Sequence, residues 1–513
     1  MHARILPYIY SFFAMVVASQ AIAQDRGYVP VPPNSAAFAS YGNTTQEQDE
    51  EKDLLAKQLD EFNRRLQALE TGAAEQEPGS YIDRIGSLED SILETKEAIN
   101  EIDDDMGMFA KMGHGDETMT VFGRIHTDWW SFPEVGAPIN ALEPFGEGPQ
   151  ARFIFRRMRI GVKGKVKDNM LYKIEMEFAG GVNSQYRDAY LGFENLPVFQ
   201  TLLIGNQKRP YGWDHLNSSR YNIFIERPFV VEALNQDARR LGICSYGISQ
   251  DLRYNWRYGV FNQQLVQDTD GYKGNNLQGE LAGRLATTWW YDECSGGRGY
   301  GHFAVSGSWG SPNGDPLPGS APNQARYRTR PEARSTNRWL NTGRIADANN
   351  FYLGGLEYVF NAGPFNLAAE YMGTSVARTG LDAVNFHGGY AEAAYFLTGE
   401  HMPWDRKTGC LARIKPFENF FAVCDCDGFL QRGLGAWQVA ARYSYADFTD
   451  SDSPVPIEGG VGRSLTLGLN WYWNPYARMQ FNYIFGNISD RSIGEVVNDS
   501  DYQILGLRFM IDF

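Results

Sequence analysis

The chain has 513 residues, of which 43% are hydrophobic, and it contains 28 Tyr, 31 Phe, 12 Trp and 54 Gly. No segment approaches roughly 18 consecutive apolar residues, which excludes a helical membrane protein but not a β-barrel. The formal net charge of −15 is unevenly spread. Residues 47–105 hold 19 acidic and 6 basic side chains, whereas residues 106–513 hold 42 acidic and 39 basic ones, so the long C-terminal part is almost balanced.

The N-terminus has the three parts of a secretory signal peptide. His2 and Arg4 are weakly basic, residues 5–17 are apolar, and residues 21–23 form an A-x-A cleavage site. We therefore predict a signal peptide at 1–23. The alternative, a membrane-anchoring helix, is disfavoured because the apolar run is too short to span a bilayer. Residues 24–48 are polar and rich in Pro, Ser, Ala and Gln, which predicts a flexible lead-in.

Residues 49–105 carry the apolar spacing of a coiled coil. Intervals of 4, 3, 4 and 3 residues separate Leu55, Leu59, Phe62, Leu66 and Leu69, and a similar pattern resumes over 85–102. We predict a coiled-coil region at 49–105. An amphipathic hairpin packed on itself is the alternative. A coiled coil needs partner chains, so this region is an indication of oligomerisation.

From residue 118 onward the chain consists of short runs in which apolar and polar residues alternate, as in strands with lipid on one side and water on the other. We predict strands at 119–130, 151–164, 169–178, 186–194, 199–207, 240–250, 253–262, 279–291, 300–310, 350–360, 364–374, 386–398, 435–447, 461–473, 476–487 and 501–513. Connections after even-numbered strands are mostly tight, and those after odd-numbered strands are mostly long, notably 208–239 and 311–349. Short periplasmic turns and long external loops are typical of outer-membrane barrels. The predicted fold class is an all-β, sixteen-stranded antiparallel transmembrane β-barrel over 118–513.

The connection 399–434 breaks this rule, because it follows an even-numbered strand and is long. Either a strand is miscounted there or the chain carries a periplasmic insert. The five cysteines are Cys244, Cys294, Cys410, Cys424 and Cys426, and the last three lie in this connection. In an oxidising periplasm we expect a disulfide that staples the insert, with free thiols and metal binding as less favoured alternatives. The odd count leaves at least one cysteine unpaired or intermolecular.

The last strand separates two faces and ends in an aromatic residue. Leu505, Leu507, Phe509, Ile511 and Phe513 fall on one face. A last strand ending in Phe resembles the C-terminal signature by which Gram-negative outer-membrane barrels are recognised for assembly. We therefore expect outer-membrane lipid and the barrel assembly machinery as partners, with Phe513 as the assembly signature.

Charged residues occupy the opposite face of several strands, which predicts a water-filled lumen because a packed core would penalise them. The second strand places three cations on this face: Arg157, Arg159 and Lys163. Arg156 lies out of phase, which predicts a bulge or a rim position. A column of fixed cations on a pore wall favours anions. The alternative is that these cations pair with Glu175 and Glu177 on the next strand and hold the wall together.

Two long loops carry further cations. The 208–239 loop is the natural pore-constricting loop and holds Lys208, Arg209, Arg220 and Arg227 among several acidic residues. The 311–349 loop holds Arg326, Arg328, Arg330 and Arg334 with few acidic residues. We expect this second loop to raise the anion concentration at the pore mouth. Contact with anionic outer-leaflet lipid is the alternative.

Several segments resemble the phosphate-selective porin O and P family. They are Phe155-Arg-Arg-Met-Arg-Ile-Gly-Val-Lys-Gly164, Tyr172-Lys-Ile-Glu175, Asp188-Ala-Tyr-Leu191, Ile204-Gly-Asn-Gln-Lys-Arg-Pro-Tyr-Gly212, Ser218-Ser219 with Glu226-Arg227, Tyr395-Phe-Leu-Thr-Gly-Glu400, Ala436-Trp437 with Ala441-Arg-Tyr443, and Gly468-Leu-Asn-Trp-Tyr-Trp-Asn-Pro475. The resemblance covers about 118–513 in the same order. It implies a trimeric sixteen-strand anion channel with Lys and Arg at the constriction and an arginine ladder along the wall. The residues that match are Arg157, Arg159, Lys208, Arg209, Arg220 and Arg227. The sequence departs from the family in the acidic residues of the third loop and in the nearly balanced charge of the barrel.

The expected function is passive diffusion of small anions, with phosphate as a candidate, across the cell outer membrane of a Gram-negative-type envelope. A general, weakly selective porin and a structural anchor tethered through the coiled coil are the alternatives. Seven histidines without a nucleophile motif give no support for an enzyme. We expect a homotrimer, and no metal, cofactor or nucleic-acid partner.

Overall fold

A computed structural model describes residues 118–144, 147–167, 169–180, 184–235, 238–263, 265–266, 278–312, 325–420, 423–424, 430–431, 433–493 and 496–513. The chain divides into two compact units, Met1–Asp105 and Met106–Phe513. Every described residue belongs to the second unit. The predicted signal peptide, lead-in and coiled coil therefore lie outside the described residues and stay predictions.

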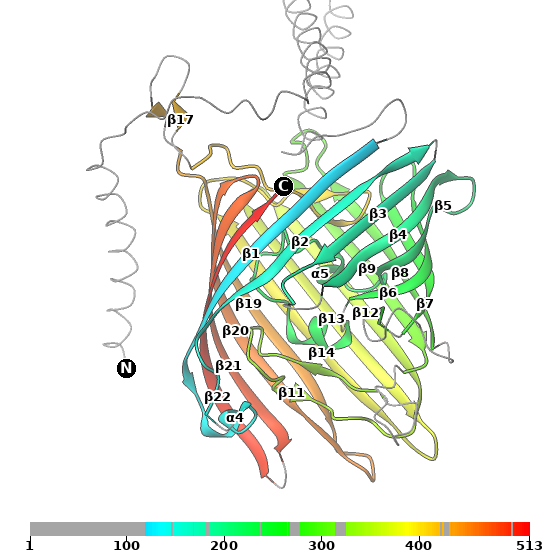
Figure 1. The fold of residues 1–513 in the computed structure, drawn as a ribbon, viewed down its shortest axis with the longest axis vertical. Coiled ribbons are helices and arrows are strands. Elements are labelled where there is room, and N and C mark those ends of the chain that lie inside the picture. The colour runs from blue at the N-terminus through cyan, green and yellow to red at the C-terminus, as the bar shows by residue number, and fades with distance from the viewer. Residues whose placement is uncertain are drawn as a thin grey trace, which may run out of the picture. The chain divides into compact units, whose positions relative to one another are not determined.

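The second unit is a closed antiparallel barrel, drawn in Figure 1. Its strands are β1 Thr118–Val135, β2 Arg152–Lys167, β3 Met170–Glu177, β4 Gln185–Leu196, β5 Gln200–Lys208, β6 Arg239–Ile248, β7 Tyr254–Asn262, β8 Gly279–Tyr291, β9 Gly299–Gly310, β12 Ala348–Ala362, β13 Phe365–Arg378, β14 Leu381–Phe396, β19 Ala436–Asp450, β20 Ile457–Asn474, β21 Ala477–Ile493 and β22 Val496–Asp512. Each strand pairs with its neighbours in chain order, and β22 closes the ring by pairing with β1. All sixteen predicted strands are present, so the predicted fold class is confirmed.

The alternation of residue types separates the two faces of the wall as predicted. On β20, Leu465 and Leu467 are exposed on the outer face, whereas Thr466 between them is buried in the interior. On β22, Phe509 is exposed and Arg508 is buried. Because successive strand residues point to opposite faces, apolar side chains contact lipid and polar ones contact the interior.

The predicted bulge in β2 is also present. His126 pairs with Arg157 and Thr127 pairs with Phe155, so Arg156 has no partner in the register. The extra residue lets Arg156 and Arg157 both reach the interior, where Arg156 donates to Glu226 of the 208–239 loop. A bulge thus changes the direction of a side chain without ending the strand.

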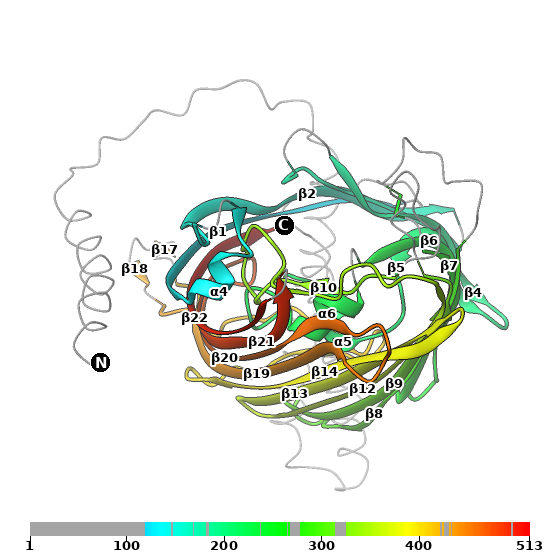
Figure 2. The same cartoon turned by 90° about the horizontal axis from the view of Figure 1, so that it is seen from below.

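Two long connections fold into the barrel (Figure 2). The β5–β6 loop, residues 209–238, contains the short helices α5 Trp213–Leu216 and α6 Phe229–Leu234, whose apolar side chains are buried. The β9–β12 loop, residues 311–347, contains the two-stranded sheet of β10 Arg328–Thr329 and β11 Leu340–Asn341. A third helix, α4 Ala137–Asn140, lies in the β1–β2 connection. By the turn-length rule these loops enter from the extracellular end.

The connection between β14 and β19, residues 397–435, is an insert at the opposite, periplasmic end. The predicted strand count is correct, so of the two explanations for its length the insert is confirmed. Its described part contains β15 Trp404–Asp405 paired with β16 Cys410–Leu411, and β17 Val423–Cys424 paired with β18 Leu430–Gln431. We call residues 397–435 the β14–β19 insert.

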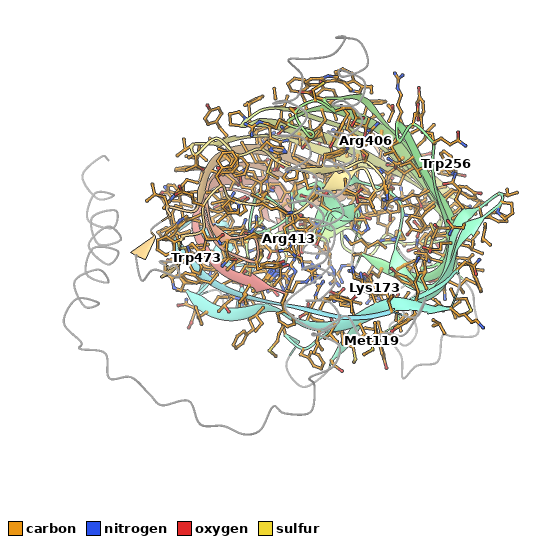
Figure 3. The ribbon with its side chains drawn as sticks, turned by 90° about the horizontal axis from the view of Figure 1, so that it is seen from above. Met119, Lys173, Trp256, Arg406, Arg413 and Trp473 are labelled. Atoms are coloured by element: carbon orange, nitrogen blue, oxygen red, sulfur yellow. The ribbon has the colours of Figure 1, made fainter. Side chains whose placement is uncertain are left out.

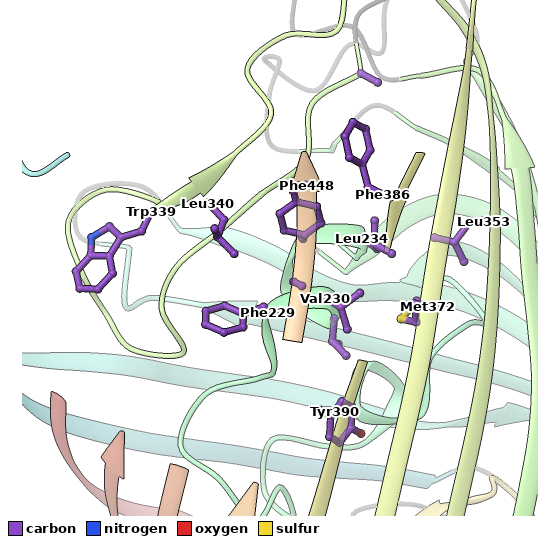
Figure 4. Packing of buried hydrophobic residues seen from close by; sticks show 14 of the residues in the cluster. Phe229, Val230, Leu234, Trp339, Leu340, Leu353, Met372, Phe386, Tyr390 and Phe448 are labelled. Carbon is purple, nitrogen blue, oxygen red and sulfur yellow. The ribbon is translucent and has the colours of Figure 1, made fainter. Parts of the chain in front are cut away.

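Apolar residues from the loops and the wall form two clusters inside the barrel. In one cluster, shown in Figure 4, Phe229 and Val230 of α6 pack with Leu340 of the β9–β12 loop and Phe386 of β14. In the other, Trp213 and Phe224 of the β5–β6 loop pack with Trp404 of the β14–β19 insert. The interior is therefore partly a packed core, and the loops gain their position from burial of apolar area.

Candidate functional site

The β5–β6 loop is fixed against the wall formed by β19 to β22. Arg478 and Gln480 donate to the carbonyl oxygen of Asn222 at 2.8 and 3.2 Å, and Asn470 donates to that of Ile223 at 3.0 Å. Arg508 donates to the carbonyl oxygen of Ile225 at 2.5 Å. These wall donors are buried. The inward polar positions of these strands therefore hold a loop rather than line open water.

Opposite this packed wall, side chains of β2, β3 and β4 remain partly accessible in the interior. Arg159, Lys173 and Arg187 on these strands are half-buried, and we propose a solute path between the β5–β6 loop and the wall formed by β2 to β5. In the end-on view of Figure 3, Arg413 lies inside the ring of strands, whereas Trp473 and Trp256 lie at its outer edge. The interior is packed beside β20 to β22 because the β5–β6 loop contacts these strands.

The three cations predicted on the inward face of β2 differ in their contacts. Arg159 makes ion pairs with Glu177 at 2.6 Å and Glu175 at 3.8 Å. Arg157 is buried, and its guanidinium lies 3.3 Å from Nδ1 of His126. The predicted pairing with the β3 carboxylates is therefore present for Arg159 but not for Arg157. Lys163, on the same face, is exposed.

Lys208 and Arg209, two predicted pathway residues, lie within the packed part of the loop. The Lys208 ammonium donates to the carbonyl oxygens of residues 215, 216 and 217 at 2.7 to 2.9 Å, at the end of α5. Arg209 forms a buried ion pair with Glu280 at 3.1 Å. Their contacts fix the loop to itself and to β8. Neither side chain is placed as a freely accessible lumen cation.

Arg220 and Arg227, the other two predicted loop residues, each meet one carboxylate. Arg220 lies 2.9 Å from Asp512 of β22, and Arg227 lies 2.8 Å from Asp214 of α5. Both arginine side chains keep a larger exposed fraction than their carboxylates.

Sequence reasoning did not single out several interior cations that the structure places here. Arg124 of β1 donates to Glu175 at 2.7 Å and to Ser219 of the β5–β6 loop at 3.0 Å. Arg187 of β4 lies 3.9 Å from Glu177. The signal that could have found Arg124 is the alternation of β1, whose inward face also carries His126. Strand phase alone does not tell which inward cation lines the path.

The four arginines predicted at the pore mouth lie in the described part of the β9–β12 loop, which folds inward. Trp339 and Leu340 of this loop are fully buried, and Trp339 packs edge-on against Tyr502 with ring centroids 5.1 Å apart. The described part of this loop, residues 325–347, thus folds inward, and its effect on the anion concentration at the pore mouth stays a prediction. Burial of the Trp339 and Leu340 side chains stabilises the inward position of the loop.

The arginines of this loop are partly buried and mostly engaged. Arg326 donates to Oδ1 of Asn341 at 3.0 Å, and Arg330 donates to the carbonyl oxygen of Ser335 at 2.9 Å. Arg328 is half-buried. Burial and the nearby charge of Arg156 lower the pKa of Arg334 to about 10.

Glu226 is a buried carboxylate of the β5–β6 loop that contacts two arginines of the wall. It accepts from Arg156 at 2.5 Å and lies 3.0 Å from Arg508. Burial alone would raise the pKa of Glu226, but the charges of Arg156 and Arg508 hold it well below its usual range. The carboxylate is thus ionised at neutral pH, and it joins β2, the β5–β6 loop and β22.

The β14–β19 insert reaches into the interior from the periplasmic end. Its carbonyl oxygens at Thr408 and Gly409 accept from Arg257 at 2.6 Å and Arg284 at 3.2 Å. Gly409 has φ +62°, and a Cβ there would lie 2.9 Å from Nδ2 of Asn255, so the turn needs glycine. The insert thereby covers two wall cations with backbone oxygens.

The cysteine predictions have a mixed outcome. Cys244, Cys294 and Cys410 are free thiols. A disulfide that staples the insert therefore does not include Cys410, which is buried beside the β15–β16 turn. The side chains of Cys424 and Cys426 lie outside the described residues, so a disulfide that includes them stays a prediction. The described residues contain no group of three or more His, Cys, Asp or Glu placed to hold a metal ion.

The end of the chain is part of the barrel seam. Phe513 and Gly123 of β1 exchange backbone hydrogen bonds, with N···O distances of 2.9 and 3.2 Å. The role of Phe513 in assembly stays a prediction. In the part of the chain that the structure describes, no helix has the length and apolar character needed to cross a membrane.

Comparisons with known proteins identify the family of this chain. The family model "Phosphate-selective porin O and P" matches residues 141–513, and the chain belongs to this family. An uncharacterized protein of Caulobacter vibrioides is 27% identical over 410 residues, which cover 78% of this chain and 75% of that protein. The family and the closed barrel make this protein a porin channel of the outer membrane rather than an enzyme.

The chain is also similar, at low identity, to solved structures of outer-membrane proteins. An anion-selective porin from Comamonas acidovorans is 12% identical with a TM-score of 0.46, and the match covers 77% of this chain and 100% of that one. The trimer form of OmpT from Vibrio cholerae is 11% identical with a TM-score of 0.46, covering 78% and 100%. The channel DcaP of Acinetobacter baumannii is 11% identical with a TM-score of 0.46, covering 79% and 100%.

Proposed function

We propose that the channel passes small anions by passive diffusion, with phosphate as a candidate solute, and that it works as a homotrimer. One observation carries this proposal. In four ion pairs of the interior, the cationic side chain has a larger exposed fraction than the carboxylate it contacts, whereas Arg239–Asp188 and Arg330–Glu232 show the opposite order.

The exposed fractions of the side chains show this asymmetry at four pairs. For the cation and then the carboxylate, they are 23% and 11% for Lys173 and Asp188, 16% and 4% for Arg187 and Glu177, 16% and 1% for Arg220 and Asp512, and 23% and 7% for Arg227 and Asp214. In these four pairs the carboxylate is the more buried partner. A passing solute therefore meets N–H donors first.

This arrangement reconciles a nearly balanced charge with a preference for anions. At short range a solute responds to the nearest groups, because screening and distance weaken the contribution of the carboxylates behind them. Guanidinium donors replace part of the hydration of an anion, and their partial neutralisation keeps binding weak enough for release. The acidic residues of the β5–β6 loop thus serve to hold cations in place.

The test is the reversal potential of purified protein in a planar bilayer under a salt gradient, repeated with phosphate added. We expect an anion-selective current that phosphate reduces. The Arg220→Gln, Arg227→Gln double variant should move the reversal potential toward zero, whereas Arg463→Gln on the outer face of β20 should not. A wild-type current without anion preference would establish a general porin instead. Absence of any conductance would favour the structural anchor.

The coiled coil at 49–105 is proposed to hold the trimer together, and tethering of the outer membrane is its alternative. Deletion of this segment should convert trimers to monomers in cross-linking experiments while conductance per barrel is kept. An unchanged oligomeric state together with a weakened envelope would support the tether.

A further inference from the structure

A small cavity lies where the β5–β6 loop, the β14–β19 insert and the last three strands meet. Arg220 and Tyr221 of the loop, Ile414 of the insert, and Tyr472, Arg478 and Met510 of the wall line it. Its volume is about 10 Å³, close to the roughly 10–15 Å³ that one water molecule needs on the same scale. The cavity is too small for a polyatomic oxyanion.

Arg478 is a buried cation at this cavity whose described contacts include no carboxylate. It is 1% exposed. Its two terminal nitrogens donate to the hydroxyl of Tyr472 at 3.1 Å and to the carbonyl oxygen of Asn222 at 2.8 Å. Its Nε is buried and has no hydrogen-bond partner. A fully buried guanidinium with only neutral acceptors is unfavourable unless a negative charge comes close.

Two more guanidinium groups lie at the same junction and share one side-chain carboxylate. Arg220 lies 2.9 Å and Arg413 lies 2.6 Å from Oδ2 of Asp512. Arg413 also lies over the ring of Tyr476, 4.4 Å from its centroid. Positive charge from the loop, the insert and the wall therefore gathers around the cavity. A water molecule would fill the space but would not offset this charge.

We propose that the cavity binds a single monatomic anion of the halide class, such as chloride, between Arg220 and Arg478. The ion would accept the unused N–H of Arg478 and lie close to the buried guanidinium, whose described contacts include no carboxylate. Because the site is built from the loop, the insert and the wall, the ion holds all three together. This inference concerns a fixed structural ion and does not depend on which solutes the channel passes.

The experiment uses the purified full-length protein in detergent. Thermal unfolding is followed in sodium chloride and in sodium gluconate at equal ionic strength. We expect the melting temperature to rise with chloride concentration and to saturate. Crystals grown in bromide should show an anomalous scattering peak within hydrogen-bond distance of Arg478 Nε.

The variants separate a specific site from a general salt effect. Arg478→Gln should lose the chloride-dependent rise in melting temperature, and Arg463→Gln, an exposed arginine on β20, should keep it. Equal melting temperatures in both salts without a bromide peak would mean water only and would overturn the proposal. A bromide peak without stabilisation would show an adventitious ion only, and a rise that Arg478→Gln retains would show a general salt effect; both also overturn it.

The bromide peak in the wild-type protein keeps the proposal testable if Arg478→Gln does not fold. Neither readout depends on ion permeation. A failure of this site is therefore distinguishable from a failure of the proposed anion preference, which reversal potentials measure.

Discussion

The backbone N–H of Leu411 donates to Oδ1 of Asn217 at 2.9 Å. Leu411 belongs to the β14–β19 insert, which enters from the periplasmic end, and Asn217 follows α5 in the β5–β6 loop, which enters from the other end. The two loops thus meet inside the barrel through a buried hydrogen bond. This contact joins the β5–β6 loop to the β14–β19 insert.

Breaking this hydrogen bond should loosen the contact between the loops. Asn217→Ala leaves the buried N–H of Leu411 without an acceptor, which costs about 1–3 kcal/mol. We expect a lower melting temperature and a noisier single-channel current. Asn419→Ala, which alters an exposed asparagine of the same insert, is the control. Identical noise in both variants would show that the loops are held without this bond.

Removing the inner part of the insert should widen the channel. Replacement of residues 403–413 by a short Gly-Ser linker takes away Trp404 and Leu411, which pack against the β5–β6 loop. We expect a larger single-channel conductance and entry of larger sugars in liposome swelling. Heat-modifiable mobility on gels checks that the barrel is intact. Unchanged conductance in a folded barrel would place the narrowest point elsewhere.

The ion pair between Arg442 of β19 and Glu332 of the β9–β12 loop should be among the most sensitive to substitution. The two groups lie 2.8 Å apart and are buried. Arg442→Met leaves a buried carboxylate unpaired, which costs about 3–5 kcal/mol. Thermal unfolding should show this loss, and the double variant Arg442→Met, Glu332→Gln should recover part of it. A double variant as unstable as the single one would argue against the pair as the cause.

Acid should weaken the contact made by Glu226. The folded-state pKa of this carboxyl lies well below its usual range because Arg156 and Arg508 favour the charged form. Its stabilisation is therefore complete above the unfolded-state pKa of about 4.3 and is lost as the pH falls through the lower folded-state pKa. Glu226→Gln should reduce stability near neutral pH and flatten the acid-side dependence.

The control for this pH dependence is Glu293→Gln, which removes a carboxylate whose side chain is 70% exposed. The stability of this variant, measured from roughly pH 3 to pH 7 around the reference carboxyl pKa, should follow that of the wild type. A Glu226→Gln profile parallel to the wild type would contradict the role assigned to this ion pair.

The local alternation of apolar and polar residues was sufficient to predict the barrel and the two faces of its strands. The period of two is a property of each strand by itself, so sixteen strands, their order of long and short connections and the inward phase of Arg157 and Arg159 could be predicted. The bulge at Arg156 was visible as a break in the same phase. The family resemblance rested on these segments and is confirmed over residues 141–513.

The sequence by itself therefore determined a sixteen-stranded outer-membrane barrel with cations on its inner face. Only the tertiary structure decided which carboxylate each cation contacts, because the partners are distant in sequence: Arg442 and Glu332 are 110 residues apart, and Arg508 and Asp128 are 380 apart. It also decided that the β9–β12 loop and the insert fold inward, since burial of Trp339 and Trp404 depends on surfaces that exist only once the barrel has closed.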